Sequence, residues 1–182
     1  MENCTHVYYG TGKGKTTAAV GLAVRAAGAG FRVLFCQFMK SGETAELSVL
    51  KTIPRLTVLR PENRYPFSSR MTAEDRTEIR KEHDRILKEI GTILSDLPRP
   101  AQEDPAASSV LVVLDELAWA FHHDLVDKDL ALSLLDEKKA EFVITGRISV
   151  PDLLARADYI TAFQEEDHPY HRGIPARKGI EY

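Results

Sequence analysis

Apolar runs alternate with segments of helical spacing along most of the chain. The runs predict strands over residues 5–9, 32–38, 56–59, 110–114, 140–145 and 159–163. The run Val33 to Cys36 is apolar without interruption, which is typical of a strand covered on both faces. Helices are predicted over residues 15–29 and 151–156. A long amphipathic helix is predicted from Thr72, its N-cap, with Asp75 three residues further on.

This alternation of strands and helices predicts an α/β fold. Its sheet is mainly parallel, with helices on both faces and right-handed crossovers. Residues 98–109 contain three prolines and no large apolar side chain, so we expect an exposed loop that is too short to separate two domains. Residues 1–182 are therefore predicted to form a single domain, with residues 164–182 as an irregular tail.

The composition is that of an ordinary globular domain. Of 182 residues, 43% are apolar and 28% are charged, which is enough to build a core without disulfides. Lys and Arg number 24 against 27 Asp and Glu, and a net charge of −3 argues against non-specific nucleic-acid binding. Cys4 and Cys36 have no neighbours at metal-ligand spacing. No apolar stretch suits a membrane span or signal peptide, so we expect a cytoplasmic protein without membrane contact.

The strongest local motif lies between the first predicted strand and helix. It reads Gly10-Thr11-Gly12-Lys13-Gly14-Lys15-Thr16-Thr17. Such a loop surrounds phosphate with backbone N–H groups at a helix N-terminus, while Lys15 adds charge and Thr16 offers a hydroxyl to Mg²⁺. The spacing departs from the usual one, because Tyr9 stands where a glycine is expected. The alternative interpretation is a glycine-rich turn with incidental lysines.

A second motif is a run of apolar residues that ends in two carboxylates, Asp115 and Glu116. Ligands of open α/β sheets bind at the carboxyl ends of the strands. Asp115 is therefore predicted to hold Mg²⁺ opposite Thr16, directly or through water. Taken alone, the motif also fits a buried strand followed by a helix-capping Asp. Together the two motifs predict a site for a magnesium nucleoside triphosphate.

The sequence offers no obvious catalytic nucleophile. Cys36 lies in an apolar run, and His6 alternates with core residues and is expected to be partnered. His83 is predicted on the exposed side of the long helix, and His122 with His123 on a solvated face. This pattern favours a reaction in which the protein positions ATP and another substrate brings the reacting group.

Several further segments occur in an order that resembles one known family. They are Gln37-Phe38-Met39-Lys40-Ser41-Gly42-Glu43, Leu114-Asp115-Glu116, Thr145-Gly146-Arg147, Ala157-Asp158-Tyr159-Ile160-Thr161 and the ending Gly173-Ile174-Pro175-Ala176-Arg177-Lys178-Gly179-Ile180-Glu181-Tyr182. From Val7 onwards the chain resembles the P-loop ATP:corrinoid adenosyltransferases, the cob(I)alamin adenosyltransferases of bacterial cobalamin synthesis and salvage. The family's own phosphate loop is shortened in the same way.

The resemblance implies a RecA-like fold and transfer of the 5′-deoxyadenosyl group of ATP to cobalt(I) of cobalamin or a precursor such as cobyrinic acid a,c-diamide, with release of triphosphate. It implies a homodimer and a flavoprotein reductant. Lys13, Lys15 and Arg147 are implied as catalytic, and Thr16, Asp115 and Glu116 as metal ligands. The implied nucleotide and corrinoid contacts are Gly10, Thr11, Gly12, Lys13, Gly14, Lys15, Thr16, Thr17, Gln37, Lys40, Tyr65, Phe67, Arg177 and Gly179. Residues 164–182 become an active-site tail.

The chain departs from the family pattern in several places, and the segment after Lys40 is short. Ala162-Phe163 replaces Glu-Met, and Asp167 replaces a Lys before His-Pro. Gln37, Lys40 and Glu43 fit solvated loop residues equally well, and Arg147 fits a surface residue at a strand end. Tyr65 and Phe67 fit core residues as well as a cover for a flat ligand. The competing functions are a P-loop phosphotransferase or ATPase, in which Glu116 polarises a water or hydroxyl, and a non-catalytic nucleotide-binding module.

Overall fold

The computed structural model describes residues 2–40, 42, 44–65, 70–97 and 109–180. Within them lies one parallel sheet in the order β3-β2-β4-β5-β1-β6, which confirms the predicted α/β class. Its strands are β1 (Thr5–Tyr9), β2 (Arg32–Gln37), β3 (Leu56–Leu59), β4 (Val110–Asp115), β5 (Glu141–Gly146) and β6 (Tyr159–Ala162). Each predicted strand is present, with ends that differ by no more than a residue.

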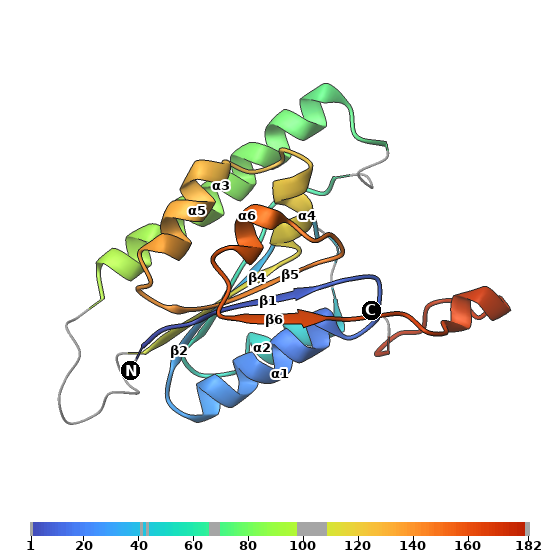
Figure 1. Ribbon diagram of the computed structural model, residues 1–182, viewed down its shortest axis with the longest axis horizontal. Helices are drawn as coiled ribbons and strands as arrows, with labels where there is room; N and C mark the ends of the chain where they lie inside the picture. Colours follow the sequence, from blue (N-terminus) through green and yellow to red (C-terminus); the bar gives the residue numbers. More distant parts are fainter. Residues whose placement is uncertain (1, 41, 43, 66–69, 98–108, 181–182) are drawn as a thin grey trace.

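Helices cover both faces of this sheet (Figure 1). On one face lie α1 (Lys15–Gly28) and α2 (Ala45–Leu50), and on the other lie α3 (Ala73–Ser95), α4 (Leu117–His122), α5 (Lys128–Asp136) and α6 (Pro151–Leu154). A short 3-10 turn, η2 (Pro169–Arg172), interrupts the predicted irregular tail. The sequence did not predict α2, α4 and α5, since two of them have only six residues and show no clear period.

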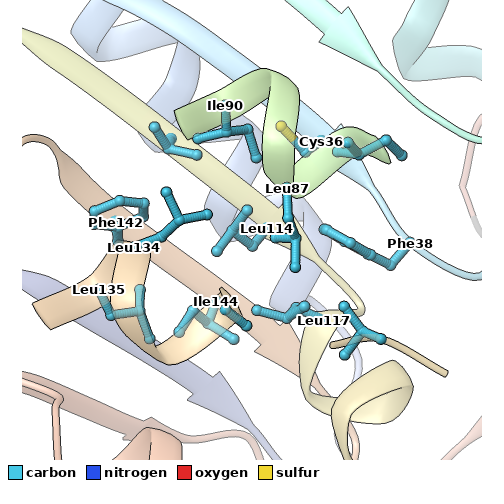
Figure 2. Packing of buried hydrophobic residues seen from close by; sticks show 14 of the residues in the cluster. Cys36, Phe38, Leu87, Ile90, Leu114, Leu117, Leu134, Leu135, Phe142 and Ile144 are labelled. Atoms are coloured by element: carbon cyan, nitrogen blue, oxygen red, sulfur yellow. The ribbon is translucent and has the colours of Figure 1, made fainter. Parts of the chain in front are cut away.

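Each face of the sheet has its own apolar core. The larger core lies under α3 to α6, and Figure 2 shows Leu87 and Ile90 of α3 with Leu134 of α5 over Leu114 and Phe142 of the sheet. The smaller core lies under α1, where small residues such as Ala19 and Ala23 let the helix approach β2, β4 and β5 closely. Burial of one large apolar side chain stabilises the fold by about 1.5–3 kcal/mol. The two cores together fix the strand ends that carry the polar residues described below.

The long helix α3 begins as predicted, but one of its residues was predicted on the wrong face. Thr72 and Asp75 form a reciprocal capping box at its start. The prediction that His83 lies on the exposed side is wrong, because His83 is 0% exposed and belongs to the buried face of α3 with Ile79 and Ile86. A residue four positions after Ile79 lies on the same helix face, so the apolar stripe carries His83 into the core.

The predicted loop over residues 98–109 lies outside the described residues, apart from Ser109. In the part of the chain that the structure describes, no helix is both long and apolar enough to cross a membrane. Figure 1 shows the tail leaving β6 at the end of the sheet where the loop after β1 also lies, and projecting outward. Ile180 in this tail is 55% exposed, so its side chain is not buried against the rest of the described chain.

Candidate nucleotide site

The glycine loop, residues 10–17, packs closely against the segment that follows β6. The N–H of Gly12 donates to the carbonyl of Phe163 at 2.8 Å. A Cβ on Gly12 would lie 2.6 Å from the carbonyl oxygen of Gln164. Gly10 has a φ of 115°, and a Cβ there would lie 2.3 Å from the carbonyl oxygen of Phe163. Glycine is therefore required at both positions, by close backbone approach and, at Gly10, also by conformation.

Lys15 lies at the start of α1 with its side chain folded back over the loop. Its ammonium donates to the carbonyl oxygen of Gly12 at 2.6 Å, and the residue is only 8% exposed. Burial lowers the pKa of Lys15, and the neighbouring Arg147 lowers it further, while Glu116 opposes both. The sequence-predicted pair Lys15 and Arg147 thus lies close enough to interact, although Arg147 itself is exposed.

Asp115, at the end of β4, lies at the centre of a hydrogen-bonded cluster and is 0% exposed. Its Oδ1 atom accepts from the hydroxyl of Thr16 at 2.8 Å and from the hydroxyl of Thr145 at 2.7 Å. Strand β5, which ends in Thr145 and Gly146, lies between β1 and β4 and brings the glycine loop and Asp115 to the same sheet edge. The predicted juxtaposition of Thr16 and Asp115 is present in the structure.

Lys40 supplies the cation of this cluster. Its Nζ atom lies 2.7 Å from Oδ2 of Asp115 and 3.4 Å from Oγ1 of Thr16. The Lys40 side chain is 28% exposed, whereas that of Asp115 is fully buried. The ion pair therefore has one partner that is held in place and one that is free to turn toward solvent.

The segment that presents Lys40 is held on two sides. The N–H of Met39, a residue with a φ of 61°, donates to Nε2 of His83 at 3.1 Å. The Nδ1 atom of His83 lies 2.7 Å from the carbonyl oxygen of Leu125, so this nitrogen carries the proton. From the other side, Arg60 donates to the carbonyl oxygens of Lys40 and Gly42 at 3.2 and 2.6 Å.

Glu116 follows Asp115 in a left-handed backbone conformation, with a φ of 62°. Its N–H donates to the hydroxyl of Thr145 at 2.9 Å. Burial raises the pKa of the Glu116 carboxyl, and the adjacent Asp115 raises it further, while Lys40, Lys15 and Arg147 act in the opposite direction. Thr145 therefore donates its hydroxyl proton to the carboxylate of Asp115 and accepts, through its oxygen, the backbone N–H of Glu116.

Gln37, at the end of β2, is a fully buried amide with an unused acceptor. Its Nε2 donates to Glu46 at 3.4 Å, whereas its Oε1 has no hydrogen-bond partner. Gln37 is in register with Asp115 on the neighbouring strand, so it belongs to the same sheet edge. A buried polar atom without a partner is costly and commonly marks a place where a ligand or water binds.

The structure does not gather all predicted residues here. Tyr65 is half-buried against the larger core, and its hydroxyl donates to Glu82 at 2.6 Å. Burial, and then this bond to Glu82, raises the pKa of Tyr65 to about 12. Arg177 and Gly179 lie in the exposed tail. Phe67 and Glu43 lie outside the described residues.

Sequence reasoning missed three residues of this region: Thr145, His83 and Arg60. Thr145 had a usable signal, because it ends a predicted strand and is followed by Gly-Arg. His83 had another, since its spacing from Ile79 places it on the apolar stripe. Arg60 had none, because it reaches Lys40 from a different strand end.

Oxygen atoms of a hydroxyl and a carboxylate are the donors that Mg²⁺ prefers. Thr16 and Asp115 present such a pair, and the Lys40 ammonium lies within hydrogen-bonding distance of both. The position therefore accepts positive charge, and the residues present fit a magnesium ion.

A glycine loop at the start of α1, with a hydroxyl and a carboxylate opposite it on a parallel sheet, defines a P-loop nucleotide-binding protein of RecA-like fold. The chain belongs to the family described as ATP:corrinoid adenosyltransferase BtuR/CobO/CobP, whose model matches residues 1–182.

Curated relatives agree with this family. The corrinoid adenosyltransferase of Pseudomonas aeruginosa is 30% identical over 179 residues, which cover 97% of this chain and 82% of that protein. The corrinoid adenosyltransferase of Escherichia coli K12 is 30% identical over 189 residues, with coverage of 97% and 84%. Among solved structures, the cytoplasmic domain of EssC matches with a TM-score of 0.53 at 16% identity, covering 97% of this chain and 34% of that one. This last likeness concerns the fold alone.

Proposed function

We propose that the protein transfers the 5′-deoxyadenosyl group of ATP to cobalt(I) of a corrinoid, either cobalamin or a precursor. The cobalt attacks C5′ of the ribose, the C5′–O bond breaks, and triphosphate leaves with the electron pair of that bond. Family membership over the whole chain supports this reaction, and the observation that carries it is the Thr16–Asp115 contact of 2.8 Å beside the glycine loop. The two oxygen atoms in this contact are the ligands expected for the metal ion of a metal-bound triphosphate.

The main catalytic task is then to stabilise charge on the leaving triphosphate. Lys15, Arg147 and the N–H groups of the glycine loop supply fixed positive charge and hydrogen-bond donors, with Lys13 on the same loop. Thr16 and Asp115 would hold Mg²⁺, with Glu116 beside them. The bound ion would supply positive charge that neutralises the phosphates. Lys15 must exchange its present acceptor, the carbonyl oxygen of Gly12, for phosphate oxygens.

The state of the thiols and imidazoles near the site supports a nucleophile that comes from the substrate. Cys36 is fully buried, and burial raises the pKa of its thiol far above neutrality, so a thiolate does not form. Both ring nitrogens of His83 are already hydrogen-bonded, one to the N–H of Met39 and the other to the carbonyl oxygen of Leu125. Cobalt(I) is itself a strong nucleophile and needs no activation by a side chain.

The remaining contacts follow from the same proposal. The free Oε1 of Gln37 accepts a hydrogen bond from the nucleotide. Tyr65 and Phe67 cover the lower face of the corrinoid, and Arg177 and Gly179 in the tail complete the site. The enzyme works as a cytoplasmic homodimer, and a flavoprotein supplies the electron that reduces cobalt(II).

The deciding experiment is an anaerobic assay with ATP, Mg²⁺ and chemically reduced cob(I)alamin. The corrinoid spectrum follows formation of the cobalt–carbon bond, and the nucleotide products are separated in parallel. Triphosphate in equal amount to the alkylated corrinoid is the expected result. ADP and phosphate without alkylation would instead identify a phosphotransferase or ATPase.

A further inference from the structure

The Lys40 ammonium lies where a metal ion would be expected from the donors around it. It contacts Asp115 at 2.7 Å and Thr16 at 3.4 Å, while Thr16 and Asp115 also contact each other. In the protein without nucleotide, the ammonium therefore neutralises the carboxylate that the metal would otherwise neutralise. These contacts of Lys40 therefore affect how a metal ion enters the site.

The backbone that carries Lys40 is fixed independently of this ion pair. Met39 is held by His83, and the carbonyl oxygen of Lys40 is held by Arg60. The N–H of Phe38 donates to the carbonyl oxygen of Asp115 at 2.8 Å, which ties β2 to β4 at the same level. Release of the ammonium thus needs only rotation of a partly exposed side chain, without rearrangement of the sheet edge.

The charges around the site explain why a divalent cation is unattractive there without nucleotide. The Lys40 ammonium lies 2.7 Å from the carboxylate of Asp115, and the Lys15 ammonium lies over the adjacent glycine loop, 2.6 Å from the carbonyl oxygen of Gly12. These two cations already balance the two carboxylates of Asp115 and Glu116. A dication that entered would add charge to a set already neutral or positive. A triphosphate reverses this balance, because it brings several negative charges to the same place.

We propose that Lys40 is an internal substitute for the divalent cation, which neutralises Asp115 in the nucleotide-free protein and makes metal binding depend on ATP. The inference rests on the proposed nucleotide site. When the metal and triphosphate bind together, the ammonium leaves Asp115 and turns to the phosphates. Lys40 thereby sets the order in which metal and nucleotide bind.

Binding of Mn²⁺, measured by the electron paramagnetic resonance signal of the free ion, tests this proposal without any turnover. The proteins are the wild type, Lys40→Met, Lys40→Arg and a matched control, Lys51→Met, whose lysine is exposed beyond the end of α2. In the absence of ATP, we expect Lys40→Met to bind one Mn²⁺ at least about tenfold more tightly than the wild type. Lys40→Arg, which keeps the charge, and the control should both stay weak.

Two further measurements locate the effect. The double variant Lys40→Met/Asp115→Asn should lose the gained Mn²⁺ binding, which places the ion at Asp115. The ratio of Mn²⁺ affinities with and without ATP should be smaller in Lys40→Met than in the wild type, as linkage requires. Should Lys40→Met prove poorly folded by circular dichroism, Lys40→Gln replaces it in all measurements.

The outcomes separate the two proposals. If wild-type protein binds no Mn²⁺ even with ATP, the nucleotide-site proposal itself fails. If the wild type binds Mn²⁺ with ATP, but nucleotide-free Lys40→Met binds it no better than the wild type, then only the role of Lys40 is overturned. A gain in Lys40→Met that survives Asp115→Asn would also overturn it, since the ion would then lie elsewhere.

Discussion

The buried imidazole of His83 should make the stability of the protein depend on pH in a defined window. Burial lowers the pKa of His83 from 6.5 to about 4, against smaller opposing effects of Leu125 and Glu82. The unfolded chain therefore binds a proton at higher pH than the folded one. The stabilising effect is fully present above about pH 6.5 and is lost as the pH falls toward 4.

The size of the effect follows from the same pKa. At about 1.4 kcal/mol per pKa unit, the free energy of unfolding should fall by about 3 kcal/mol across this window. That is a large part of the roughly 5–15 kcal/mol typical of a domain. The physical reason is that a protonated imidazole in this position is poorly solvated and can no longer accept the hydrogen bond from Met39.

Urea unfolding at about pH 7.5, 5.5 and 4.5 measures this loss when the wild type is compared with His83→Gln. Glutamine retains one donor and one acceptor but has no titration in this range. The wild type should lose about 2–3 kcal/mol more than the variant between the highest and lowest pH. His122→Gln, which replaces an exposed histidine, serves as control and should follow the wild type. Parallel pH dependence of the wild type and His83→Gln would refute the reasoning.

Three more outcomes are expected. Lys15→Ala should lower the rate of adenosyl transfer roughly ten- to hundredfold or more, because a charge-assisted hydrogen bond to phosphate is worth about 1.5–3 kcal/mol. Near-normal rates in the anaerobic assay would contradict the nucleotide site. Thr145→Val leaves the carboxylate of Asp115 and the N–H of Glu116 each without one hydrogen-bond partner, so the melting temperature should fall by about 2–10 °C in calorimetry. An unchanged melting temperature would show that the hydroxyl is dispensable. Phe67→Ala should slow adenosylation from cobalt(II) far more than from pre-reduced cobalt(I), with ATP affinity unchanged; equal losses from both starting states would return Phe67 to the core.

Much of the fold could be predicted because its signals are local. A strand buried on both faces reads as an apolar run, and the capping box of Thr72 and Asp75 is complete within four residues. The glycine loop is equally local, because its conformation depends on glycines at fixed spacing and on the helix that follows. The short helices α2 and α4 were not predicted, since six residues are too few to show a helical period of apolar positions.

The candidate site was only partly predictable, because its contacts join residues that are far apart in the chain. The sequence indicated Thr16, Asp115 and Lys40 separately, but the strand order alone brings them within hydrogen-bonding distance. The local sequence around His83 contains charged neighbours on both sides, which suggested exposure. The spacing from Ile79 pointed the other way, and packing of α3 against the sheet follows that spacing and buries the imidazole.

The sequence by itself determined the strand–loop–helix at the N-terminus, the acidic strand end and the family, because each is encoded by adjacent residues. The tertiary structure decided which side chains complete them. It placed the Thr145 hydroxyl between the carboxylate of Asp115 and the backbone N–H of Glu116. It also placed His83 against the N–H of Met39, and Arg60 against the carbonyl oxygen of Lys40. The physical reason is that hydrogen bonds and ion pairs depend on distances of about 3 Å, and across a sheet these distances follow from strand order and helix packing.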